Sequence, residues 1–189
     1  DGDEILSVEI ADGNSTASFW YEDDLASTFA VTVSDNASAP DGTDGTDDAS
    51  DDVSVFADVA SEFLLNNPGD MTAGTRLGYV VTRKDQFGNL VTSGAQTAYL
   101  YSDSVGTAQF YDAAVDGNLV TEIVIADGSS AADVWYYDDL AATVTVTASD
   151  DSFAPDGTTG VNDAVLPSRY STTSPALCDS TGSEARACR

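Results

Sequence analysis

Histidine is absent from this chain, and cysteine occurs only at Cys178 and Cys188. The lack of histidine excludes His-containing zinc sites, Ser-His-Asp triads and imidazole acid–base catalysis. The two cysteines lie close to the end of the sequence and form no Cys-x-x-Cys motif. In an oxidising environment we expect them to form a disulfide that closes a small loop in the tail.

Basic residues are nearly as scarce. Six Lys and Arg stand against 33 Asp and Glu, which gives a formal net charge of −27, and Lys84 is the only lysine. This charge repels nucleic acids and anionic membranes, because proteins bind both by neutralising phosphates with Lys and Arg. It attracts cations, and two explanations stay open: a high-salt environment that screens the charge, or carboxylates that bind Ca²⁺.

Long hydrophobic runs are also missing. No segment approaches the roughly 18 apolar residues of a membrane span, and no signal-peptide pattern begins at Asp1. We therefore expect no membrane insertion and, if the protein is secreted, a mature chain. Helical periodicity occurs nowhere, whereas residues such as Phe29, Val31 and Val33 alternate with small or polar neighbours. Period-two alternation is typical of half-buried strands and predicts an all-β fold.

The alternating segments belong to an internal repeat. Residues 1–49 align without a gap on residues 116–164, and 27 of the 49 positions are identical. A repeat spaced by 115 residues has the size of an immunoglobulin-like (Ig-like) sandwich, not of a short solenoid unit. Each copy holds three alternating segments joined by Asp-containing turns. This pattern predicts a three-stranded meander followed by an Asp/Gly/Pro-rich loop.

The unrepeated middle of the chain is also rich in predicted strands. Leu77, Tyr79 and Val81 share one face of a strand that ends in a turn at Gly88-Asn89. The run AGTRLGYVVTRKDQFGNLVTSG, the later YLYS and the second copy's AATVTVTASD resemble the bacterial and archaeal Ig-like surface repeats of the broad invasin/intimin-type class. The resemblance covers roughly residues 60–164 and implies an Ig-like β-sandwich at a cell surface.

In that class each repeat would begin near residue 60 and end with a strand like the one at residues 51–58. We therefore predict immunoglobulin-like β-sandwich repeats, one partial and one nearly complete. Residues 1–59 would be the C-terminal half of a repeat, including its last strand. Residues 60–164 would be a repeat that lacks a typical last strand, and residues 165–189 a tail.

A lone half-sandwich leaves an apolar face uncovered and a strand edge unpaired. Either the chain is a piece of a longer tandem protein, or a neighbour completes the half by strand exchange and builds a fibre. In both cases the predicted partner is a neighbouring repeat of the same protein. The predicted assembly strand, which links one unit to the next in cis or in trans, consists of Asp51, Asp52, Val53, Ser54, Val55, Phe56, Ala57 and Asp58.

The loop after each predicted meander is rich in aspartate. In the first copy it carries Asp35, Asp41, Asp44, Asp47 and Asp48, and the second copy retains Asp150, Asp156 and Asp163. The spacing is not that of an EF-hand, so a solvated turn and a Ca²⁺ site both remain open. Acidic pairs at a neighbouring turn complete the candidate Ca²⁺ ligands: Asp23, Asp24, Asp35, Asp41, Asp138, Asp139, Asp150 and Asp156.

Two further kinds of site have weaker signals. Trp20 and Trp135, each followed by tyrosine, favour either core packing or an aromatic platform for a sugar. Asn14 and Asn36 match the N-glycosylation pattern. Carboxylate pairs are abundant, yet nothing marks one as a glycosidase acid, so we predict no enzyme.

Together these features predict a structural protein that is extracellular or attached to a cell surface. Its units would stack end to end into a fibre or surface array, with strand complementation between them. The alternative is an adhesin or carbohydrate-binding module that recognises a glycan or host surface through loops or exposed aromatic residues.

Overall fold

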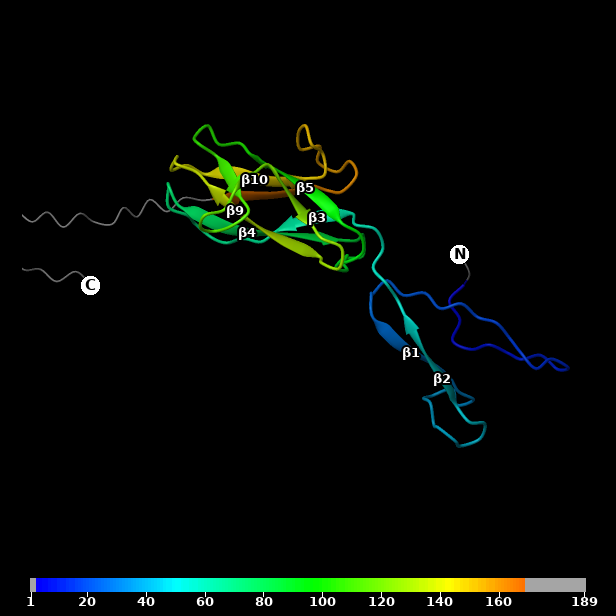
Figure 1. The fold of residues 1–189 in the computed structure, drawn as a ribbon. Helices are drawn as coiled ribbons and strands as arrows, with labels where there is room; N and C mark the ends of the chain where they lie inside the picture. Colours follow the sequence, from blue (N-terminus) through cyan, green and yellow to red (C-terminus); the bar gives the residue numbers. More distant parts are fainter. Residues whose placement is uncertain (1–2, 169–189) are drawn as a thin grey trace, which may run out of the picture. The chain divides into compact units, whose positions relative to one another are not determined.

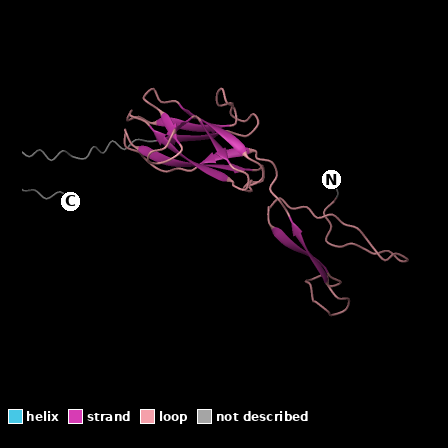
Figure 2. Ribbon diagram, in the orientation of Figure 1, coloured by secondary structure: helices cyan, strands magenta, loops and turns pink. Residues whose placement is uncertain are grey.

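The computed structural model describes residues 3–168, which form eleven strands. These residues contain no helix, and therefore no helix long and apolar enough to cross a membrane. Two compact units divide between Ala57 and Asp58, and we call them the first and the second unit. The strands are drawn as arrows in Figure 1 and coloured magenta in Figure 2. The prediction of an all-β fold is confirmed.

The second unit is a sandwich of two antiparallel sheets. The larger sheet has the order β3-β4-β9-β6-β7, formed by Glu62–Leu65, Arg76–Lys84, Ala131–Tyr137, Gln109–Tyr111 and Leu119–Val120. The smaller sheet has the order β11-β10-β5-β8, formed by Ala164–Ser168, Val144–Ser149, Gln96–Ser102 and Glu122–Ile125.

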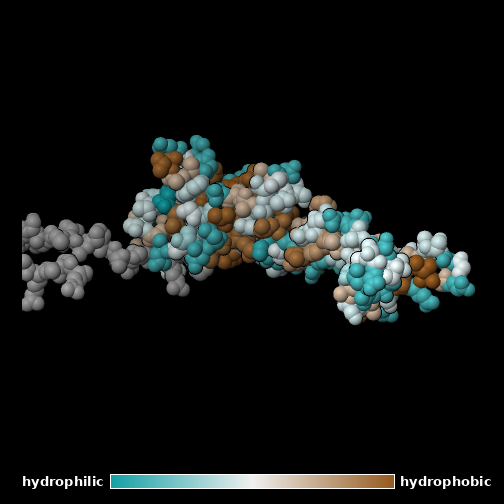
Figure 3. Space-filling view, turned by 90° about the horizontal axis from the view of Figure 1, so that it is seen from below, coloured by the Kyte–Doolittle hydropathy of each residue, from teal (hydrophilic) through white to brown (hydrophobic). Residues whose placement is uncertain are grey.

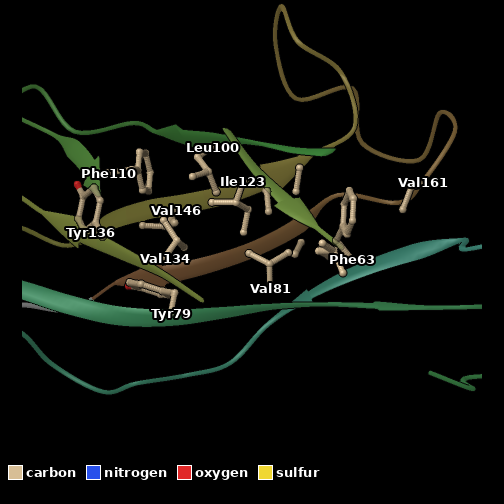
Figure 4. Packing of buried hydrophobic residues seen from close by; sticks show 14 of the residues in the cluster. Phe63, Tyr79, Val81, Leu100, Phe110, Ile123, Val134, Tyr136, Val146 and Val161 are labelled. Carbon is tan, nitrogen blue, oxygen red and sulfur yellow. The ribbon is translucent and has the colours of Figure 1, made fainter. Parts of the chain in front are cut away.

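The core of this unit lies between the two sheets (Figure 4). Tyr79 and Val81 of β4 and Val134 and Tyr136 of β9 are buried on one side, and Val146 of β10 faces them from the other sheet. In β4 and β9 the buried residues alternate with more exposed ones, as expected where one face of a sheet is covered. Tyr79 and Tyr136 meet edge to face, with ring centroids 6.4 Å apart.

A buried arginine and a buried aspartate hold the start of the β4–β5 connection. Arg83 donates from Nε to the Val91 carbonyl (2.8 Å) and from Nη2 to the carbonyls of Gly94 (2.6 Å) and Ser129 (2.8 Å). Asp85 accepts hydrogen bonds from the amides of Asp58, Phe87 and Asn89 and from the Asn89 side chain. Burial raises the pKa of Asp85, but these hydrogen bonds outweigh it and the pKa is lowered.

The predicted meander is wrong for the second copy of the repeat. Its three segments do form strands β8, β9 and β10, but none of these three pairs with another. β8 and β10 flank β5 in the smaller sheet, whereas β9 lies between β4 and β6 in the larger one. The alternation of apolar residues predicts which face each strand buries. Its partners lie in the unrepeated middle, where the repeat offers no signal.

A further strand forms where no typical last strand is predicted for this repeat. Residues 164–168, which span the end of the predicted repeat and the start of the predicted tail, form β11 and pair with β10 from Val144↔Ser168 to Ala148↔Ala164. Pro167 conceals the strand in the sequence, because proline cannot donate to a sheet ladder. β11 is an edge strand, where proline is tolerated.

Within residues 3–57 the first unit holds two strands, β1 at Thr28–Val33 and β2 at Ala49–Ser54, paired antiparallel. The other two predicted strands of the first copy, around Val8 and Phe19, do not form, so the meander is wrong here as well. Their equivalents in the second unit pair with β5 and β4. Residues 3–57 contain no counterpart of β4 or β5, so the segments around Val8 and Phe19 have no strand with which to pair.

Candidate functional site

The two copies of the repeat retain the same hairpin. In the first unit Val31 pairs with Asp51 and Val33 with Ala49. The positions 115 residues later pair identically, as Val146 with Leu166 and Ala148 with Ala164. Positions in the first unit can therefore be read directly against their equivalents in the second.

In the second unit the repeated segment is covered by strands from the unrepeated middle. Val134 and Tyr136 of β9 are completely buried and pair with β4. Val146 and Ala148 of β10 are completely buried and pair with β5. The middle of the chain therefore supplies both the neighbouring strands and the opposing core side chains.

In the first unit the equivalent residues are uncovered. Phe19 is 42% exposed, Tyr21 44% and Val33 47%. They line an open groove of about 340 Å³ together with Val31 and residues of β2. Hydrophobic residues that reach the surface are brown in Figure 3. The groove is a candidate docking surface, because its equivalent in the second unit forms part of a packed core.

The tryptophan of the repeat shows the same contrast. Trp135 is half-buried and lies over Gly78 of β4, where a Cβ would come within 3.2 Å of its Nε1 atom. Its equivalent Trp20 is 90% exposed. In the second unit this tryptophan packs against a strand, so exposure of Trp20 by itself does not define a sugar platform.

The predicted assembly strand already has a partner within its own unit. Asp51 to Ser54 belong to β2 and pair with β1, and the Val55 amide donates to the Ser27 carbonyl at 2.8 Å. β11 occupies the same place beside β10. In the second unit β10 has β11 on one edge and β5 on the other. β1 has β2 on the first of these edges, and among residues 3–168 no strand lies on the second. The role of residues 51–58 in linking units stays a prediction.

The carboxylates of the loop between β10 and β11 converge. One oxygen each from Asp150, Asp156 and Asp163 lies within 4.8 Å of the others. Asp163 Oδ2 accepts from the Gly157 amide (2.8 Å) and Asp150 Oδ2 from the Val161 amide (3.0 Å). The loop also bridges to the larger sheet, because the Phe63 amide donates to the Asn162 carbonyl at 2.9 Å.

The loop between β1 and β2 repeats this geometry. Asp35, Asp41 and Asp48 bring one oxygen each within 4.8 Å of the others. The Gly42 amide donates to Asp48 Oδ2 at 2.7 Å and the Thr46 amide to Asp35 Oδ2 at 2.9 Å. The carboxylate arrangement therefore forms in both units, although only the second has a closed sandwich.

The carboxylates of the loop between β10 and β11 repel one another. Burial, and then the charges of Asp150 and Asp163, raise the pKa of Asp156. The Oδ1 atoms of Asp150 and Asp163 are buried without a hydrogen-bond partner, an arrangement that is costly for a charged group. Three carboxylates at this separation match the oxygen ligands and the 2.3–2.6 Å bond lengths that Ca²⁺ prefers.

The predicted ligand set is thus brought together only in part. Asp35 and Asp41, and Asp150 and Asp156, belong to the two clusters. The third member of each, Asp48 or Asp163, is an aspartate of the same loop that the predicted ligand set does not include. Both are identical between the copies and directly precede the second strand of the hairpin, which is the signal that could have identified them.

The other four predicted ligands lie at the turn before β1 or β10 and not in either cluster. Asp138 is buried and accepts hydrogen bonds from the Tyr136 hydroxyl (2.8 Å) and the Leu140 amide (2.8 Å). Asp23 accepts the equivalent bonds from Tyr21 and Leu25, which lower its pKa. Their neighbours Asp24 and Asp139 are exposed, and the Thr107 amide lowers the pKa of Asp139.

The remaining predicted sites stay predictions. Asn14 and Asn36 are both exposed, and the Asn36 side chain donates to Asp41 Oδ2 at 2.9 Å. The proposed Cys178–Cys188 disulfide lies outside the described residues.

No family model and no curated protein matches this chain. Among solved structures, domains 4 and 5 of the S-layer protein SbsC are 19% identical with a TM-score of 0.39, over 65% of this chain and 58% of that one. The S-layer protein rSbsC(31-844) is 19% identical with a TM-score of 0.40, and the match covers 80% of this chain and 17% of that one.

A β-glycosidase from Bacteroides vulgatus is 12% identical with a TM-score of 0.41, and the match covers 67% of this chain and 16% of that one. The chain thus spans 58% of the first of these structures and less than a fifth of the other two. At these low identities and TM-scores the similarities assign no function to the chain.

Proposed function

We propose that this chain is a structural, extracellular or cell-surface repeat protein that assembles through its first unit. The observation that supports this function is the unequal burial of one repeated sequence. Tyr136 is completely buried, whereas its identical equivalent Tyr21 is 44% exposed. The sequence of the first unit is thus patterned for a core that its own residues do not complete.

The energetics favour association through this face. Apolar surface removed from water contributes about 25 cal/mol per Å², and an isolated two-stranded hairpin is marginally stable. Phe19, Tyr21 and Val33 present such surface along the groove. A partner that covers them stabilises the first unit and links it to another unit in the same step.

Self-association can be measured by multi-angle light scattering over a concentration series of the full chain. We expect the average mass to rise with concentration. Phe19→Asp, which places a charge in the groove, should keep the chain monomeric. The matched control is Val124→Asp, because Val124 is comparably exposed but lies on β8 of the second unit. A wild-type chain that stays monomeric throughout, or an unaffected Phe19→Asp variant, would refute assembly through the first unit.

The alternative function, glycan or host-surface recognition, is separated by a binding assay. Saturable binding to a glycan array that is lost in Trp20→Ala, from a chain that stays monomeric, would favour the binding module. Retained monomer mass and no glycan binding would leave neither function supported.

We also propose that the two carboxylate loops bind Ca²⁺ and brace the ends of the sandwich. The support is the convergence of three carboxylates in both copies, with buried Oδ1 atoms of Asp150 and Asp163 that lack a hydrogen-bond partner. A bound cation would compensate these charges and fix the loop between the last two strands of each unit.

A further inference from the structure

The uncovered face of the first unit has a defined complement. Resting on the proposed assembly function, we infer that this face receives an antiparallel pair of strands of the β4 and β5 type. The occupant is the segment equivalent to residues 60–115 in another repeat of this protein. The second unit shows how such a segment covers the repeated sequence, and the spacing of 115 residues transfers its pairing to the first unit.

The register of the β4-type strand follows from the second unit. There Leu77 pairs with Tyr136, Gly78 with Trp135 and Tyr79 with Val134. The equivalent positions in the first unit are Tyr21, Trp20 and Phe19. An incoming β4-type strand in this register places its tyrosine against Phe19 and its glycine against Trp20, so that it buries Phe19 and covers part of Trp20, as β4 does for Val134 and Trp135.

The glycine gives this register its specificity. In the second unit a Cβ added to Gly78 would lie 3.2 Å from Trp135 Nε1, which is tighter than ordinary van der Waals contact. The repeat retains the tryptophan as Trp20. A strand that pairs here therefore needs a residue without a side chain opposite the indole, and a one-residue slip would also turn its apolar residues outward.

The β5-type strand enters between two segments of the first unit. In the second unit β5 pairs with β8 through Ala98↔Ile123 and with β10 through Ala148↔Leu100. The corresponding acceptor positions are Val8, which is exposed and outside any strand, and Val33 on the open edge of β1. One strand inserted here would give residues 7–10 a partner strand for backbone hydrogen bonds, as β5 does for β8.

Charge favours the same occupant. Residues 1–57 contain no Lys or Arg, and the only basic residues within residues 3–168 are Arg76, Arg83 and Lys84. All three lie in β4. A β4-type strand therefore carries all the basic side chains of residues 3–168, and opposite charges on pairing surfaces promote encounter and suppress wrong partners.

The probe for this inference is a fluorescein-labelled synthetic peptide of residues 74–104, which carries β4 and β5, titrated into the full chain. Anisotropy should show saturable binding at one peptide per chain. Phe19→Asp in the chain should abolish it, and Val124→Asp should not. Binding that survives in Phe19→Asp would mean that the peptide enters the second unit by exchange, and would overturn the inference.

The register is tested by a complementary pair of substitutions. A Gly78→Val peptide should bind at least about tenfold more weakly, because overpacking of this kind typically weakens binding by about tenfold or more. Valine also favours strands more than glycine does, so a loss cannot come from strand propensity. Trp20→Ala in the chain should restore binding of the Gly78→Val peptide. Equal binding of both peptides to the wild-type chain would refute the register.

These outcomes are separate from those of the assembly test. If the peptide does not bind, yet the chain associates in a way that Phe19→Asp prevents, the inferred occupant is wrong and the assembly function stands. If neither the peptide nor a second chain associates with the first unit, both fail. The circular dichroism spectrum of each variant is compared with that of the wild-type chain, to check that the variant is folded.

Discussion

At the scale of single residues, the carboxylate loops are the least ordinary feature. Asp150 and Asp163 each use Oδ2 to fix a backbone amide and leave Oδ1 buried without a hydrogen-bond partner. The pKa of Asp156 is raised because burial and its two neighbours disfavour its charge. A divalent cation reverses this balance, since it stabilises all three charged forms at once.

We predict that Ca²⁺ raises the melting temperature of the second unit by several degrees. A ligand at 100 times its Kd stabilises the folded state by about 2.7 kcal/mol. Asp163→Asn should abolish most of this shift without lowering stability in the absence of Ca²⁺, because it relieves repulsion and keeps an acceptor for the Gly157 amide. Differential scanning calorimetry with and without Ca²⁺ measures both effects.

The matched control is Asp70→Asn, which makes the same change at an exposed aspartate between β3 and β4 that belongs to neither carboxylate cluster. It should leave the Ca²⁺ shift unchanged. The shift should also shrink as the pH falls through the raised pKa of Asp156, because a protonated carboxyl binds the ion poorly. A shift of the same size in Asp163→Asn, or one reproduced by NaCl at equal ionic strength, would speak against a site.

At the scale of strands, the repeat provides matched positions with different surroundings. Val146 in β10 is completely buried, whereas Val31, its identical equivalent in β1, is only partly buried. Val146→Ala should lower the free energy of unfolding by about 2 kcal/mol, because it removes buried methyl groups and leaves a cavity. Val31→Ala should change the main transition by less than about 0.5 kcal/mol.

Urea unfolding followed by tryptophan fluorescence measures this difference. Trp135 reports on the second unit, where it is half-buried, whereas Trp20 is 90% exposed and should change little on unfolding. Equal costs for the two substitutions would mean that the first unit has a core of its own. In that case the proposed docking face would be wrong.

The strands also show what the sequence could and could not predict. Alternation identified β4, β5, β9 and β10 and the buried face of β4, because one covered face imposes period two. It could not predict their partners, since residues 122–149 carry the same pattern whether they pair with each other or with β4 and β5. β11 was missed because Pro167 is unfavourable in any strand but an edge strand.

The carboxylate clusters were half predictable for a similar reason. Aspartates of a loop can be counted in a sequence, but their convergence depends on the hairpin that closes it. Pairing of Ala148 with Ala164 brings the two ends of the loop together, so Asp163 comes close to Asp150. In the sequence Asp23 and Asp138 cannot be told apart from the aspartates of the clusters, yet each accepts a hydrogen bond from a tyrosine hydroxyl two residues earlier.

At the scale of the whole molecule, charge is the dominant property. A net charge of −27 with no His means that the compact state carries strong self-repulsion at neutral pH. The Debye length falls from about 10 Å at 0.1 M salt to about 3 Å at 1 M. Screening should therefore stabilise the folded chain, independently of any specific ion site.

We predict that the melting temperature rises between 0.1 and 1 M NaCl and rises similarly in NaBr, which has the same ionic strength but a different anion. Light scattering over the same range should show stronger association, because like-charged chains then approach more easily. A melting temperature that is unchanged or lower in both salts would show that repulsion does not limit stability, and would weaken the explanation that the acidity suits a high-salt environment.

The order of strands along the chain has a consequence for biosynthesis. β4 and β5 are interior strands of their sheets, yet they leave the ribosome before β9, which pairs with β4, and before β8 and β10, which pair with β5. Until those later residues are made, β4 can pair only with β3, and β5 has neither of its partner strands. Exchange of these strands between adjacent polypeptides is thus easiest during translation, and completion of the last hairpin ends that interval.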